Sequence, residues 1–139
     1  MGSRGKCREL VLKTLYASEM SDQAWDLVLT QFLAQDKMTE KDKLFTESLL
    51  EKILENQDKI DSLIKEKLEN WDFARLNSID RIILRIGVCE MLYFPEIPIK
   101  VSLDEAIELA KKFSSDEAGK FVNGILDAVA KSNKEILAK

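Results

Sequence analysis

The stretch that decides the fold is residues 79–93, which read IDRIILRIGVCEMLY. Placed on a helix, it is apolar on nearly every side, and Arg81 and Arg85, at positions i and i+4, form its main polar line. A helix of this kind must be surrounded by other elements, so we expect it at the centre of the molecule. Gly87 in its interior costs about 1 kcal/mol relative to alanine, which indicates that another helix approaches closely there.

The segments before this stretch follow the period of amphipathic helices. We expect a first helix over residues 6–18 and a second that begins after Ser21 and Asp22, which can serve as N-caps. A third helix begins at the capping box of Thr39 and Asp42. The apolar positions of a fourth helix are Ile60, Leu63, Ile64, Leu68 and Trp71.

Two further helices are expected after the central one. The only two prolines, Pro95 and Pro98, first break the chain. Capping boxes of the S-x-x-E type then begin helices at Ser102 and Ser114, and residues 131–139 are polar enough to fray. No convincing strand pattern occurs anywhere in the sequence.

These patterns predict one all-α domain over residues 1–139, with about seven helices in two packed subdomains. The connection that precedes the central helix is the best place to divide the chain. We therefore expect an N-terminal subdomain at about residues 4–72 and a C-terminal subdomain at about residues 73–139.

The composition argues against catalysis. Hydrophobic residues make up 45% of the chain, which is enough for a core, and histidine is absent. Without histidine neither a Ser–His nor a Cys–His pair can form, and the commonest zinc ligand is missing. The sequence contains no GxGxxG and no GxxxxGK[ST] loop for phosphates. We expect a protein that is not an enzyme and that holds no cofactor or metal.

The cysteines and the apolar segments predict a cytoplasmic protein without a membrane span. Cys7 and Cys89 lie far apart within apolar helical patterns, as is typical of buried, reduced thiols. Charged residues interrupt the most apolar stretch, so it is too polar to cross a bilayer. The first residues lack the apolar core of a signal peptide.

Charge is unevenly distributed along the chain, although its sum is only −4. The first thirteen residues hold a single acid, Glu9, and their basic residues are Arg4, Lys6, Arg8 and Lys13. This start is either a solubilising leader or an arm for phosphate groups, and so few contacts would need a co-binding partner. Residues 36–61 hold eight acids against five lysines, an alternation that indicates a solvated face.

The segment KFVNG at residues 120–124 is unusual inside a helical pattern. Asn123 and the two glycines Gly119 and Gly124 disfavour a helix, so core packing explains them less well than it explains Val122. Asn123 could brace a neighbouring loop, and Gly124 could allow a close helix crossing. Alternatively, Lys120 and an incompletely buried Phe121 could contact an RNA phosphate and the face of a base.

Four segments, in this order, resemble the NusB family of bacterial transcription antitermination factors. They are Arg8-Glu9 with Thr14-Leu15-Tyr16, Asp80-Arg81 with Leu84-Arg85-Ile86 and Glu90, Ile97-Pro98 with DEAIELAKKF at residues 104–113, and KFVNGILD at residues 120–127. The likeness spans essentially the whole chain, and its last segment is the most specific. It implies an all-α fold of two packed helical subdomains.

The resemblance also implies partners and contact residues. NusB proteins bind the boxA element of ribosomal RNA leader transcripts as a heterodimer with NusE, a small-subunit ribosomal protein. This heterodimer joins RNA polymerase and other Nus factors. The positions here that match the family's RNA contacts are Arg4, Lys6, Arg8, Tyr16, Lys120 and Phe121. The family's NusE contact falls on Asp80, which would pair with a basic residue of NusE.

The sequence departs from the family pattern at both of its expected RNA-contact segments. Gly5 occupies one basic position of the arginine-rich start, which implies weak RNA binding without NusE. Asp116 and Glu117 precede the Lys-Phe pair and would repel phosphates. One alternative is a helical protein–protein adaptor with little RNA binding of its own. Another is a stand-alone relative of the RNA-binding domain of ribosomal RNA methyltransferases. The resemblance allows both a monomer and a homodimer.

Overall fold

The computed structural model describes residues 3–69 and 72–139 of the chain. Its regular elements are eight α-helices and one 3-10 helix, and these described residues contain no strand. The all-α fold class is therefore confirmed. The chain forms two compact units, Met1–Glu51 and Lys52–Lys139, which divide inside a continuous helix. The subdomain boundary expected near residue 72 stays a prediction.

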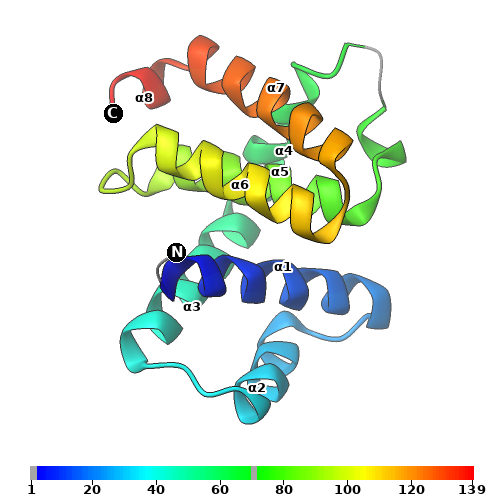
Figure 1. The fold of residues 1–139 in the computed structure, drawn as a ribbon, viewed down its shortest axis with the longest axis vertical. Coiled ribbons are helices and arrows are strands. Elements are labelled where there is room, and N and C mark those ends of the chain that lie inside the picture. The colour runs from blue at the N-terminus through cyan, green and yellow to red at the C-terminus, as the bar shows by residue number, and fades with distance from the viewer. Residues whose placement is uncertain (1–2, 70–71) are drawn as a thin grey trace. The chain divides into compact units, whose positions relative to one another are not determined.

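The N-terminal unit contains α1 (Ser3–Ser21), α2 (Trp25–Gln35) and the first part of α3 (Glu40–Glu55). α1 extends beyond the expected residues 6–18 at both ends. α2 packs against α1 (Figure 1). The apolar stripes of these helices supply the buried side chains Val11, Leu12, Val28, Leu29 and Phe45.

The two helix caps expected in this unit have different outcomes. Thr39 caps α3 as expected, because its Oγ1 accepts a hydrogen bond from the backbone N–H of Asp42 at 3.2 Å. The expected caps of α2 are wrong: Ser21 is the last residue of α1, and its hydroxyl donates back to a carbonyl oxygen of that helix at 2.7 Å. Asp22 follows with φ of 61°, a left-handed conformation that ends helices.

The C-terminal unit is built around α5 (Ser78–Tyr93), the helix that the sequence placed at the centre. The remaining elements of this unit are α4 (Gln57–Lys65), η1 (Phe73–Arg75), α6 (Ile99–Phe113), α7 (Asp116–Ser132) and α8 (Lys134–Leu137). α5 packs against α4, α6 and α7, and α6 and α7 lie side by side (Figure 1). The expected place of Trp71 on the fourth helix lies outside the described residues.

The all-round apolar pattern of α5 corresponds to burial on nearly all sides. Ile82, Ile83, Leu84, Ile86 and Val88 are all buried. A Cβ atom added at Gly87 would lie 2.6 Å from Cδ1 of Leu126 on α7. Glycine is therefore required by a close approach of α7, as the sequence predicted.

The capping box expected at Ser102 is wrong. α6 begins at Ile99, after Pro98, so Ser102 lies inside the helix and is buried. Its Oγ donates a hydrogen bond at 2.9 Å to the carboxylate of Glu90 on α5. A buried carboxylate needs hydrogen-bond donors, so the serine serves the packing of α5 against α6 and not the start of a helix.

The last part of the chain differs from expectation in two details. Ser115 caps α7 in place of Ser114, since its Oγ accepts from the N–H of Ala118 at 3.0 Å. The end that was expected to fray instead forms α8, whose Ile136 is buried. Ile136 is the one buried residue of this short helix, and a single apolar residue within a mostly polar segment is too weak a pattern to predict a helix from the sequence.

Candidate functional site

The basic residues at the start of the chain occupy different environments on α1. The Arg4 guanidinium lies 4.3 Å from the centre of the Phe45 ring, and that of Arg8 lies 5.7 Å from it. Arg8 is only 3% exposed, whereas Lys6 is exposed. Cation–π contacts with one buried ring bring both arginines against α3. The structure leaves Lys6 exposed, as it does Lys13 two turns later on α1.

Tyr16 lies further along α1 and is 38% exposed. Partial burial restricts the rotamers of this tyrosine, so it loses little conformational entropy on binding. The exposed part of its ring can still stack on a base. Met20, one turn later, is also exposed and extends the apolar strip. The i, i+4 spacing of Tyr16 and Met20 in the sequence indicates that they share one face of the helix. Met20 was not among the predicted site residues.

Lys120 and Phe121 lie in the first turns of α7. Lys120 is exposed, and its Nζ lies 3.8 Å from Oε1 of Glu117, an exposed pair that contributes little to stability. Phe121 is half-buried. Asp116 and Glu117 occupy the first turn, where the helix dipole favours negative charge, so they have a structural reason to precede the Lys-Phe pair.

The two glycines that flank this pair, Gly119 and Gly124, differ in their surroundings. A Cβ atom at Gly124 would meet nothing within 4 Å, so the expected close helix crossing at that position is wrong. The crossing is instead at Gly119, where a Cβ atom would lie 3.0 Å from Cγ of Lys111 on α6. Asn123 is exposed, and Gly124 beside it leaves the surface open.

Asp80 is held in the first turn of α5 by Asn77. The backbone N–H of Asp80 donates to Oδ1 of Asn77 at 2.8 Å, and Nδ2 of Asn77 donates to Oδ2 of Asp80 at 3.1 Å. The side chain is nearly buried, and its other oxygen, Oδ1, has no hydrogen-bond partner among the described residues. A buried carboxylate oxygen without a donor is costly in folding, and because Oδ1 itself has almost no exposed surface, another molecule can approach Asp80 only at the rest of the residue.

A cluster of cations around Phe73 supports the start of α5. Arg85 donates from Nε and Nη2 to the two carboxylate oxygens of Asp61, at 2.8 and 3.0 Å. Lys65, Arg85 and Arg81 place their charges 5.3, 5.4 and 6.0 Å from the Phe73 ring. The sequence identified the Arg81–Arg85 line but not Asp61, because that partner lies 24 residues away along the chain.

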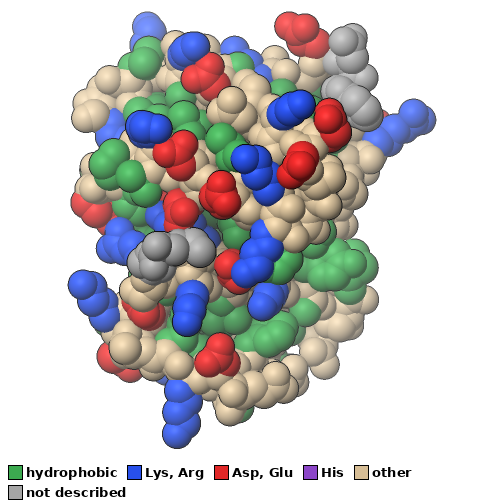
Figure 2. All heavy atoms as spheres, in the orientation of Figure 1, with side chains coloured by type: hydrophobic (Ala, Val, Ile, Leu, Met, Phe, Trp, Pro, Cys, Tyr) green, Lys and Arg blue, Asp and Glu red, His purple; other side chains and the backbone are tan. Residues whose placement is uncertain are grey.

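Charged side chains are intermixed on the face shown in Figure 2, where lysine and arginine lie among aspartate and glutamate. With a net charge of −4, the protein has no general attraction for a polyanion. Any binding of phosphates therefore depends on local cations such as Lys6 and Lys120, or on charge that a partner supplies.

The cysteines are buried, and no metal site is found in the described part of the chain. Cys7 and Cys89 are both free thiols with no exposed surface. Burial raises the pKa of each thiol, that of Cys89 far above its ordinary value. Among residues 3–69 and 72–139, no group of histidine, cysteine or acidic side chains could hold a metal ion, and no helix is long and apolar enough to cross a membrane.

Comparisons with known proteins identify the relatives of this chain. The family model described as NusB family matches residues 6–131. A transcription antitermination protein NusB from Methylacidiphilum infernorum is 42% identical over 134 residues, which cover 96% of this chain and 94% of that protein. A crystal form of T. maritima NusB is 38% identical and superimposes with a TM-score of 0.88, over 98% of this chain and 97% of that one. A crystal structure of NusB and NusE in complex with dsRNA has the same fold (23% identity, TM-score 0.87, 96% and 99% covered).

Proposed function

The chain belongs to the NusB family, and from this premise we propose that it is a transcription antitermination factor that binds boxA RNA together with NusE. The boxA element lies in the leader of ribosomal RNA transcripts. The protein acts in the cytoplasm, within the complex of RNA polymerase and other Nus factors, and supports ribosomal RNA synthesis. It contributes binding surfaces and carries out no catalytic step.

The observation that carries this proposal is that each compact unit offers an accessible cation together with an accessible aromatic ring. These are Lys6 and Tyr16 in the N-terminal unit, and Lys120 and Phe121 in the C-terminal unit. Single-stranded RNA is bound through its phosphates and through the faces of unstacked bases, which require these two types of side chain. The family membership supports the same choice of ligand.

The six predicted RNA contacts divide by their accessibility. In the proposed complex Lys6 and Lys120 neutralise phosphates, while Tyr16 and Phe121 pack against bases. Arg4 lies against Phe45 and is half-buried, so it presents only part of its guanidinium. Arg8 remains a predicted contact, and its burial gives it the least surface of the six for reaching a phosphate.

NusE is proposed to bind at a surface that includes Asp80. A lysine or arginine of NusE would pair with the charge of the Asp80 carboxylate at the part of this residue that is still exposed, 9% of its surface. An ion pair at a mostly buried carboxylate is screened by salt less than one between fully exposed charges, so it would contribute to the affinity for NusE. Pairing with NusE would add the positive charge that the protein lacks.

The proposed function is tested by fluorescence anisotropy with labelled boxA RNA and with a scrambled RNA of the same composition. Each is titrated with this protein, with NusE and with both, at two salt concentrations. We expect the pair to bind boxA more tightly than either protein alone and more tightly than it binds the scrambled RNA. If the pair forms but binds both RNAs alike, the protein is a helical adaptor without boxA recognition.

A further inference from the structure

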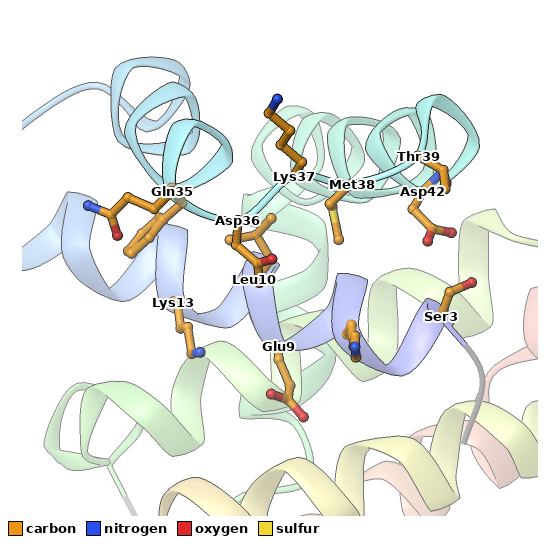
Figure 3. Close-up of a pocket in the computed structure, with 12 residues that line it drawn as sticks. Ser3, Glu9, Leu10, Lys13, Gln35, Asp36, Lys37, Met38, Thr39 and Asp42 are labelled. Atoms are coloured by element: carbon orange, nitrogen blue, oxygen red, sulfur yellow. The ribbon is translucent and has the colours of Figure 1, made fainter.

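A pocket lined by described residues lies entirely within the N-terminal unit (Figure 3). It has a volume of about 700 Å³ and is enclosed by one face of α1 and by residues 32–42, which end α2 and begin α3. This volume is within the range of pockets that hold small ligands, and a single nucleotide is of that class.

The walls of the pocket combine three types of chemistry. Leu10, Phe32 and Met38, all half-buried, provide an apolar surface that includes an aromatic ring. Lys6 contributes an exposed ammonium group at the side of α1. Asp36 contributes a carboxylate from the segment that follows α2, and the acids Glu9 and Asp42 also line the pocket. A ring, a cation and a hydrogen-bond acceptor are the groups that bind a base, a phosphate and a base edge.

The orientation of the side chains favours an occupant between α1 and the segment of residues 36–39. In Figure 3 the side chains of Asp36 and Met38 point toward α1, with Asp36 above Leu10, whereas Lys37 points away from the pocket. Within the part of the chain that the structure describes, the carboxylate of Asp36 has no hydrogen bond and no ion pair. Its two oxygens are therefore available to a ligand.

We propose that this pocket holds one unstacked nucleotide of the bound RNA and selects a base that carries an exocyclic amino group. The base packs on Phe32 and Met38, its amino group donates to the carboxylate of Asp36, and its phosphate pairs with Lys6. The inference rests on the proposed RNA binding and adds to it a site that reads the base. Cytosine is the simplest such base, since its N4 amino group is the donor that an aspartate accepts.

The same arrangement rejects uracil. Uracil has a carbonyl oxygen where cytosine has its amino group, so its O4 would face the Asp36 carboxylate and two acceptors would oppose each other. The difference in binding free energy between the two bases is larger than shape alone would give, because uracil leaves the Asp36 carboxylate without a hydrogen-bond donor. Asp36 thus lowers the general affinity for RNA and raises its selectivity.

The test compares oligocytidylate with oligouridylate of equal length, each labelled with fluorescein and titrated with the full chain in the presence of NusE. Wild type is expected to bind oligocytidylate at least about fivefold more tightly, the lower limit for one good contact to a base edge. Asp36→Ala should bring this ratio close to one. The matched control is Glu51→Ala, which removes an exposed acid of the same unit that does not line the pocket and should leave the ratio unchanged.

Lys6→Ala separates the phosphate contact from base selection. It should weaken both oligonucleotides equally and lower the salt slope by roughly 0.7, leaving the ratio between them unchanged. Equal binding of the two oligonucleotides by wild type would overturn the inference while leaving RNA binding intact. Loss of NusE pairing in Asp36→Ala, with the ratio unchanged, would also overturn it, since the pocket would then be a protein contact. If no RNA binds at all, the proposed function fails first.

Discussion

Lys6 and Arg8 are both basic residues near the start of α1, but two positions along a helix point in different directions. Lys6 reaches solvent and the pocket beside α1, whereas Arg8 lies near the Phe45 ring and is buried. A guanidinium can pack on an aromatic ring at little cost because it is planar and weakly hydrated. The positive charge of Arg8 is therefore used in packing, whereas that of Lys6 is available for binding.

Alanine variants of these two residues should have opposite effects. We expect Arg8→Ala to lower the free energy of unfolding by about 1–2 kcal/mol, through the lost cation–π contact and packing of the stem. Lys6→Ala should leave stability unchanged and reduce RNA affinity. Urea unfolding and RNA titration at several salt concentrations measure both. A salt slope that changes for Arg8→Ala as much as for Lys6→Ala, with stability unchanged, would contradict this assignment.

Substitutions of Asp80 test the proposed contact with NusE. Asp80→Asn keeps the hydrogen bonds with Asn77 within reach but removes the negative charge, so we expect NusE affinity to fall by more than about tenfold. Asp80→Lys should abolish pairing. Isothermal titration calorimetry measures the affinity, and thermal unfolding checks that Asp80→Asn still folds.

Asp104→Asn is the control for this experiment, because Asp104 is an exposed acid on α6 whose pair with Lys100 lies on the surface. It should leave NusE affinity unchanged. An unchanged affinity in both Asp80 variants would remove Asp80 from the proposed NusE surface.

At the scale of the helices, two glycines show how similar sequence signals have different causes. Gly87 in α5 lies where α7 crosses, so that a Cβ atom would meet Leu126 of the core. Gly124 in α7 faces open space and has no such requirement. Both weaken the intrinsic helix preference by the same amount, and only their neighbours distinguish them.

Alanine substitutions at the two glycines should therefore differ in sign. Gly87→Ala would place a Cβ atom 2.6 Å from Cδ1 of Leu126, so that this fully buried side chain must shift within the packed core, and we expect a loss of about 1–3 kcal/mol. Gly124→Ala should stabilise the protein by about 0.5–1 kcal/mol. Urea unfolding measures both, and a stabilising Gly87→Ala would show that α7 can move away from α5.

For the molecule as a whole, the two cysteines report on the two compact units separately. Cys7 lies in the N-terminal unit, where its Sγ donates to the carbonyl oxygen of Asp42 at 3.5 Å, and Cys89 lies on the central helix of the other unit. Burial raises the pKa of both thiols, so neither forms the reactive thiolate readily in the folded protein.

Thiol labelling in native buffer should consequently be slow at both positions and faster at Cys7 than at Cys89. Cys7 is near the start of α1, where a helix end opens easily, whereas exposing Cys89 requires the centre of the C-terminal unit to open. Mass spectrometry after timed labelling, with a urea-unfolded sample as the reference rate, resolves the two sites. Faster labelling of Cys89 would contradict the central place of α5.

The sequence predicted the helical elements better than their ends. Long apolar periods identify α1, α3, α5 and α7 because many residues contribute to each signal. Caps depend on one or two side chains, so Ser102 was assigned to a helix start although the carboxylate of Glu90 holds it inside α6. The residues expected to contact RNA and NusE were named from the family resemblance, and those assignments stay predictions.

What the sequence by itself determined is the all-α class, the central place of residues 79–93 and the family of the chain, since these follow from periodicity and from motifs spread over its length. Tertiary structure alone decided which polar residues remain accessible. Arg8 and Lys6 look alike in the sequence, yet the Phe45 ring covers one and not the other. The pocket beside α1 could not be foreseen either, because residues 3–13 and 32–42 form it only after the chain has folded. Burial and pairing depend on contacts between residues distant in the chain, which a local pattern does not contain.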